Sequence, residues 1–162
     1  MRILGIDPGI GKCGWGVIEV QGSKFKALGH GCIETSPKKE LPQRLSEVYK
    51  EIERIIKSNS PDCLSIEELF FNTNAKTAFS VGQARGVILL AAAQKNLPIF
   101  IYTPLQVKMA ITGYGRAEKS QMGKMVKAIL LLKDIPKPDD TSDALAVALT
   151  NGFSYKTSML SK

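Results

Sequence analysis

The first part of the chain places its hydrophobic positions in short runs that end at turn residues. Residues 2–6 form an apolar run that stops at Asp7, directly before a Pro-Gly pair, as a buried strand does where it enters a tight turn. Further runs cover residues 14–20 and 25–35, and a Gln-Gly-Ser segment joins them as a hairpin connection. The pattern therefore predicts three consecutive strands.

Beyond residue 40 the hydrophobic positions recur every three or four residues, which is the period of an amphipathic helix. The clearest stripe begins at Leu45 and ends before Ser60, with Pro42 close to its first turn. Short apolar runs between such segments are predicted as strands. In order, the pattern predicts helices over 45–59, 75–95, 105–112, 118–132 and 142–151, and strands over 63–66 and 99–102.

The order of these elements predicts the fold class. Three strands in an antiparallel meander, followed by alternating helices and strands, give an α/β fold with a five-stranded mixed sheet and helices on both faces. This β-β-β-α-β-α-β-α order resembles the ribonuclease H fold. We expect a single domain over residues 1–153 and a flexible C-terminal tail over residues 154–162.

The charge of the chain is positive and unevenly distributed, with 22 basic and 15 acidic residues and a net charge of +7. Residues 69–133 hold nine basic side chains and one acid, Glu118. A solvated surface is the usual explanation for a basic run. Here the excess covers a long stretch without low complexity, so the composition favours a surface that binds nucleic acid. The nine are Lys76, Arg85, Lys95, Lys108, Arg116, Lys119, Lys124, Lys127 and Lys133.

The composition also argues against several classes of protein. No apolar run approaches the roughly 18 residues that a membrane-spanning helix needs, and the first residues lack the pattern of a signal peptide. The three cysteines, Cys13, Cys32 and Cys63, are widely spaced, so we expect reduced thiols in a cytoplasmic protein. With one histidine and no paired cysteines, a structural zinc site is not expected.

Four carboxylates lie at predicted strand ends or at the start of a predicted helix, where catalytic residues are often found. Asp7 and Glu67 each follow a predicted strand, and Asp140 and Asp143 lie three residues apart at the start of the last helix. If the two strands are parallel neighbours, their ends meet at one edge of the sheet. Mg²⁺ prefers carboxylate oxygens together with water and substrate phosphate. An acid cluster on a basic protein therefore indicates metal-dependent cutting of nucleic acid.

Each of these acids also has a purely structural explanation. Asp7 could be a turn residue, Asp140 could cap the last helix, and Asp143 could favour the macrodipole of that helix. Glu67 could be a solvated strand end, although it follows three residues that look buried. All four together are harder to explain in this way, because without a cation they would repel one another and raise some of their pKa values.

Five segments of the chain are distinctive when they are taken together: residues 4–9 (LGIDPG), 66–70 (IEELF), 82–86 (GQARG), 117–121 (AEKSQ) and 140–146 (DTSDALA). In this order and at this spacing they resemble the RuvC family of bacterial Holliday-junction resolvases. The resemblance covers nearly the whole chain, and five segments in register are far more specific than any one of them.

The resemblance implies an active site and a reaction. Asp7, Glu67, Asp140 and Asp143 match the family's catalytic acids, which hold Mg²⁺ or Mn²⁺, two ions per site. The neighbouring Asp139 leaves the third position open, although the spacing to residues 143–145 favours Asp140. The resemblance further implies a homodimer that hydrolyses two strands of like polarity in a four-way DNA junction, during recombination and repair, alongside the branch-migration proteins RuvA and RuvB.

The same resemblance implies residues that contact DNA and the partner subunit. Lys108 and Lys119 match basic positions near the family's active site, and Arg116 lies in the same basic stretch; solubility is the alternative explanation for these charges. Phe70 matches an aromatic residue that stacks on an unpaired base. The helix containing residues 82–86 resembles the family's dimer helix, although packing within one subunit would use the same small residues.

Two other functions are compatible with parts of this pattern. Phosphotransferases of the actin and sugar-kinase type share the ribonuclease H core and a similar strand-turn motif, but they enclose their nucleotide between two copies of the core. A junction-binding protein without catalytic activity is the second alternative. The four intact acids argue against it.

Overall fold

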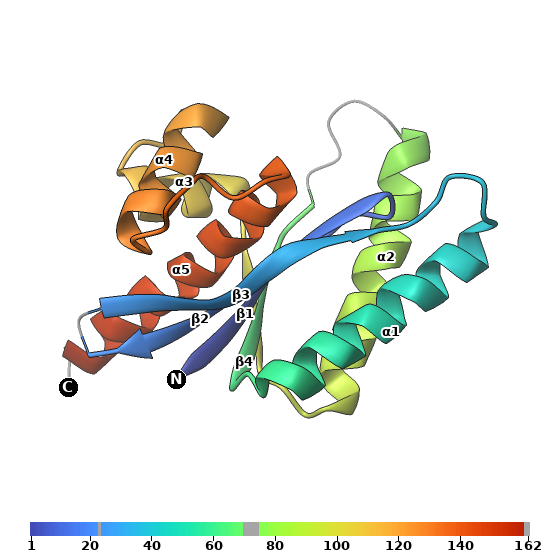
Figure 1. Ribbon diagram of the computed structural model, residues 1–162, viewed down its shortest axis with the longest axis horizontal. Helices are drawn as coiled ribbons and strands as arrows, with labels where there is room; N and C mark the ends of the chain where they lie inside the picture. The colour runs from blue at the N-terminus through green and yellow to red at the C-terminus, as the bar shows by residue number, and fades with distance from the viewer. Residues whose placement is uncertain (23, 70–74, 161–162) are drawn as a thin grey trace.

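The computed structural model describes residues 1–22, 24–69 and 75–160 and shows a twisted five-stranded sheet with helices on both faces (Figure 1). The strand order is β3-β2-β1-β4-β5. The elements are β1 (Arg2–Asp7), β2 (Lys12–Gln21), β3 (Lys24–Glu34), α1 (Leu41–Asn59), β4 (Cys63–Glu67), α2 (Ala75–Gln94), β5 (Ile99–Tyr102), α3 (Pro104–Thr112), α4 (Lys119–Ile129) and α5 (Asp139–Leu160). The predicted fold class is confirmed.

The register of the sheet brings the ends of β1 and β4 together. Strand β1 pairs antiparallel with β2 and parallel with β4, where Ile6 lies opposite Ile66. Strand β5 continues the parallel half of the sheet, with Glu67 opposite Tyr102. Because parallel strands end at the same edge, Asp7 and Glu67 are neighbours at that edge.

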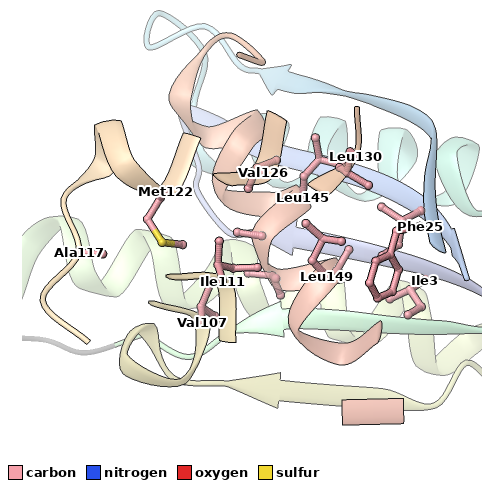
Figure 2. Packing of buried hydrophobic residues seen from close by; sticks show 14 of the residues in the cluster. Ile3, Phe25, Val107, Ile111, Ala117, Met122, Val126, Leu130, Leu145 and Leu149 are labelled. Carbon is pink, nitrogen blue, oxygen red and sulfur yellow. The ribbon is translucent and has the colours of Figure 1, made fainter. Parts of the chain in front are cut away.

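Both faces of the sheet are covered by hydrophobic cores. Helix α5 packs on one face together with α3 and α4, and Figure 2 shows Leu149 of α5 beside Ile3 and Phe25, and Leu145 of α5 beside Val126 of α4. Helices α1 and α2 cover the opposite face (Figure 1). Side chains alternate along a strand, and Ile3 and Gly5 of β1 contact the α5 layer. Asp7, two residues further along, therefore lies on the α5 side of the sheet.

Helix α5 approaches the sheet at backbone distance because glycines face it. A Cβ on Gly5 would lie 2.2 Å from the carbonyl oxygen of Ala144, and a Cβ on Gly14 would lie 1.8 Å from that of Asp140. Neither oxygen belongs to a flexible side chain, so any larger residue would have to push the helix away. These glycines place the first turns of α5 beside the edge where Asp7 and Glu67 lie.

Three helices have boundaries that differ from the prediction by three or more residues. Helix α1 begins at Leu41, before the predicted stripe starts at Leu45, because the Glu40 amide donates to Gln43 Oε1 at 3.3 Å and caps the first turn. Helix α4 ends at Ile129, and Leu131 then adopts a positive φ of 52° that reverses the chain. Helix α5 covers residues 139–160, longer at both ends than predicted, and so includes most of the segment that we expected to be a flexible tail.

The three cysteines carry free thiols. Within the described residues, none of the helices has the length and apolar character needed to cross a membrane.

The contact between Gly14 and α5 can be tested by adding one methyl group. Gly14→Ala should destabilise the protein by about 1–3 kcal/mol, since the added Cβ overlaps backbone atoms. The matched control is Gly29→Ala on β3, where the new Cβ would make ordinary contact at 3.5 Å with the Trp15 ring. Urea unfolding followed by circular dichroism measures both. Equal stability of the two variants would contradict the close approach of α5 to β2.

Candidate active site

Carboxylates from three elements line one cavity. Asp7 ends β1, Glu67 ends β4, and Asp143 lies on the second turn of α5. The cavity has a volume of about 260 Å³, and Lys108 of α3 and Lys119 of α4 also line it. The structure thus brings together three of the four predicted acids and two of the predicted basic residues.

The electrostatics of this cavity show negative charges that are crowded and poorly hydrated. The pKa of Asp7 is raised to about 8, first by burial and then by the charges of Glu67, Asp143 and Asp140. The pKa of Glu67 is raised to about 7 by burial and by Asp143. Burial also raises the pKa of Asp143. The folded protein therefore stabilises the protonated forms of these acids unless a cation is present.

Lys119 partly neutralises the acid cluster. Its Nζ lies 3.3 Å from Oδ2 of Asp143, and this carboxylate is the main reason that the pKa of Lys119 is raised. The side chain is largely exposed, so the pair adds little to stability. Lys108 also lines the cavity and, like Lys119, lowers the pKa of Glu67. Both ammonium groups therefore offset part of the negative charge of the acids.

The structure favours Asp140 over Asp139 as the fourth acid. Asp140 is not among the described residues that line the cavity, but its charge raises the pKa of Asp7, and its carbonyl is packed against Gly14. Asp139 has a side chain that is 61% exposed and lies 3.9 Å from Lys137. Of the two, Asp140 is therefore the acid whose charge acts on Asp7.

Comparison with known proteins identifies the family. Residues 3–151 match the family model described as crossover junction endodeoxyribonuclease RuvC. The chain belongs to the RuvC family. This match includes all four predicted acids and both lysines of the cavity.

Curated members of the RuvC family are similar over almost their full length. The chain is 56% identical to the crossover junction endodeoxyribonuclease RuvC of Alkaliphilus oremlandii over 149 residues, covering 92% of this chain and 91% of the relative. It is 53% identical to that of Halothermothrix orenii over 156 residues, covering 96% and 94%.

Solved structures agree with this assignment. The chain superposes on Thermus thermophilus RuvC with a TM-score of 0.90 at 36% identity, covering 98% of this chain and 97% of that one. The same relative in complex with a Holliday junction substrate gives a TM-score of 0.93, covering 98% and 96%. A yeast mitochondrial Holliday junction resolvase, at 13% identity and a TM-score of 0.66, shares the fold.

The donor atoms of the cavity fit Mg²⁺. In the described part of the chain, no three His, Cys, Asp or Glu side chains come close enough together to hold a metal ion by themselves. Mg²⁺ does not require this, because it is usually held by one or two carboxylates and keeps several waters and substrate oxygens. Half-buried carboxylates with raised pKa values supply hard oxygen ligands and uncompensated negative charge. The RuvC-type metal site nevertheless stays a prediction.

Two of the predicted DNA-binding residues are not part of this cavity as the structure describes it. Arg116 is exposed in the segment between α3 and α4 and does not line the cavity. Phe70 lies outside the described residues. The predictions for both stay open to experiment.

Sequence reasoning missed the apolar wall of the cavity and a second cavity beside it. Met122 and Val147 line the first cavity, but apolar residues with helical spacing look like ordinary core. The second cavity, of about 290 Å³, shares Lys119 and Asp143 with the first and is lined also by Lys124 and Lys137. The excess of basic residues up to Lys133 was the only signal for it in the sequence.

The raised pKa of Asp7 predicts how stability changes with pH. In the unfolded chain Asp7 loses its proton near 3.8, whereas in the folded protein it keeps the proton up to about pH 8. Between these values the folded state binds more protons, so the stability that protonated Asp7 provides is complete below pH 3.8 and is lost as the pH rises toward 8. Asp7→Asn should therefore raise the melting temperature in chelator at pH 8, and much less at pH 4.5.

The size of this effect can be measured by calorimetry or circular dichroism. Each 1 kcal/mol of relieved repulsion shifts the melting temperature of a chain of this size by about 2–4 °C. Asp134→Asn, a change at an exposed acid outside the cavity, is the control and should show no gain. A gain for Asp7→Asn that is equal at both pH values would contradict the crowding of charge around Asp7.

Proposed function

We propose that this chain resolves four-way DNA junctions as a divalent-metal-dependent endonuclease that nicks two strands of like polarity. The observation that carries this proposal is the cavity that Asp7, Glu67 and Asp143 line, in a RuvC-family chain with a net charge of +7. A Thermus relative was solved in complex with a Holliday junction substrate. The family assignment favours this function over the phosphotransferase alternative.

The proposed chemistry divides the residues of the site by role. Asp7, Glu67, Asp140 and Asp143 would hold two Mg²⁺ or Mn²⁺ ions. When bound, such ions supply activation of a water molecule and stabilisation of the departing oxygen in phosphodiester hydrolysis. The four acids keep their negative charge directed at the ions, and the apolar wall formed by Met122 and Val147 limits the access of other water.

The basic residues around the cavity are proposed to hold the DNA backbone. Lys108 and Lys119 line the first cavity, and Lys119, Lys124 and Lys137 line the second. Lysine binds phosphate as a compact point charge, so adjoining cavities with lysine walls suit successive phosphates of one strand. Arg116 would add a further phosphate contact, and base stacking by Phe70 stays part of the proposal.

The exposed face of α2 supports the proposed homodimer. Phe79, Gly82, Gly86 and Leu90 follow one another at helical spacing and therefore share one stripe of the helix. Phe79 is 72% and Leu90 is 52% exposed, and apart from the adjoining residues and backbone of α2 itself, no described atom lies within 4 Å of a Cβ built on either glycine. Among the residues that the structure describes, none therefore packs on this stripe. A second copy of the chain covering it would give two active sites, one for each nicked strand.

The domain, the partner proteins and the cellular location of the protein are also proposed. We propose one nuclease domain over residues 1–153, which is supported by Ile3 and Leu149 sharing one core. The RuvA and RuvB proteins are proposed partners, and the cytoplasm is the proposed location.

Cleavage of a synthetic four-way junction tests the function. With Mg²⁺ or Mn²⁺ the protein should make paired nicks, and chelator should prevent them. Asp7→Asn should bind the junction as the unmodified protein does but lose at least about 100-fold in cleavage rate, the upper end of what even supporting residues of a metal site contribute. An active Asp7→Asn variant would show that the acids are wrongly assigned. Binding without any nicks by the unmodified protein would favour the non-catalytic junction binder.

The dimer has its own test. Leu90→Glu should convert the protein to a monomer in analytical ultracentrifugation, since it places a charge in the apolar stripe of α2. The matched control is Leu131→Glu after α4, where the side chain is 88% exposed and lies outside this stripe. Dimers that persist in Leu90→Glu would rule out α2 as the contact.

A further inference from the structure

The turn that follows Asp7 is held from outside by the residue after β3. Thr35 donates its side-chain hydroxyl to the carbonyl oxygen of Ile10, and its backbone amide donates to the carbonyl of Gly11 at 3.1 Å. Thr35 is only 6% exposed, so these bonds do not compete with bulk water. Two consecutive carbonyls of the turn are therefore fixed by one buried residue.

Arg44, in the first turn of α1, determines the direction of the Thr35 hydroxyl. Its Nε lies 2.9 Å from Oγ1 of Thr35. A guanidinium can only donate hydrogen bonds and a carbonyl can only accept them. The Thr35 hydroxyl must therefore accept from Arg44 and give its one proton to Ile10. The positive charge of Arg44 strengthens both bonds of this chain.

The turn transmits this restraint to Asp7. It is closed so tightly that a Cβ on Gly9 would lie 2.0 Å from the carbonyl oxygen of Lys12. Its two ends are paired in the sheet, where Asp7 lies opposite Gly14. A compact turn with paired ends and a clamped middle has little freedom, so the Asp7 backbone is held even though the neighbouring acids repel its carboxylate.

We propose that Thr35, oriented by Arg44, is a positioning residue that keeps the Asp7 carboxylate directed into the cavity with Glu67 and Asp143. This inference rests on the proposed metal-dependent function, and it adds hydrogen bonds from Arg44 of α1 through Thr35 to the turn, all outside the residues that line the cavity. Its role is to prepare the metal site before DNA or metal binds.

Metal binding without DNA is the measurement that tests this role. Thr35→Val removes the hydroxyl and keeps the shape of the side chain. It should weaken Mn²⁺ binding about 10–100-fold, as loss of a supporting partner does in other metal sites, and should lower kcat by a similar factor. The affinity for a four-way junction in chelator should stay within about twofold, and Thr35→Ser should restore both Mn²⁺ binding and kcat.

A second variant and two matched controls separate positioning from stability. Arg44→Met should weaken Mn²⁺ binding in the same direction and by a smaller factor, and it decides the test if Thr35→Val does not fold. Thr150→Val removes an equally buried hydroxyl, which donates to the carbonyl of Ala146 at 2.8 Å on α5, and should leave Mn²⁺ binding unchanged. Arg54→Met removes an exposed arginine of α1 that pairs with Glu51, and should also leave it unchanged.

The outcomes distinguish this inference from the proposed function. If the unmodified protein neither binds Mn²⁺ nor cuts a junction, the proposed function fails. If the unmodified protein does both and the Thr35→Val and Arg44→Met variants match it, the positioning role alone is overturned. Failure of Thr35→Ser to restore binding, or equal weakening by Thr150→Val, also overturns it.

Discussion

The contact between α5 and the glycine-lined face of β1 and β2 is the constraint on which the acid cavity depends. Only the absence of side chains at Gly5 and Gly14 lets the helix backbone approach so closely. This approach carries Asp140 and Asp143 to the edge where Asp7 and Glu67 end their strands. A helix packed at the usual distance on larger side chains would hold the same acids too far away to act on Asp7.

Bringing these acids together costs stability, and the cost explains several neighbouring features. Burial and mutual repulsion raise the pKa values of Asp7, Glu67 and Asp143. Lys119 relieves part of the repulsion from the rim of the cavity without filling it. The elements that carry the acids are far apart in the sequence, but each is rigid: paired strands, a tight turn and a long helix. Rigidity of this kind is required where like charges would otherwise move apart.

Sequence patterns predicted what depends on local periodicity. The five strands, the mixed sheet and the position of Asp7 and Glu67 at strand ends follow from apolar runs that stop at polar residues. Features that depend on contacts between distant segments could not be predicted in this way. The early start of α1 rests on a polar capping pair, the apolar wall at Met122 resembles core, and the clamp of Thr35 on Ile10 joins residues 25 positions apart. Spacing in the sequence favoured Asp140 over Asp139 without deciding between them, and only the fold shows that the charge of Asp140 acts on Asp7.

The cavity is negatively charged, whereas the chain as a whole is positively charged. These opposite charges suit a single polyanionic substrate because they act over different distances. A net charge of +7 attracts DNA from beyond the protein surface, with a range of about 8–10 Å at physiological salt. The acids act mainly within the cavity, where they repel a bare phosphate but attract a divalent cation. Cation and phosphate each reduce the repulsion that the other would meet there, so their binding should be mutually favourable. A linear polyanion without the shape of the substrate would be attracted to the basic surface but would not place a phosphate in the acid cavity.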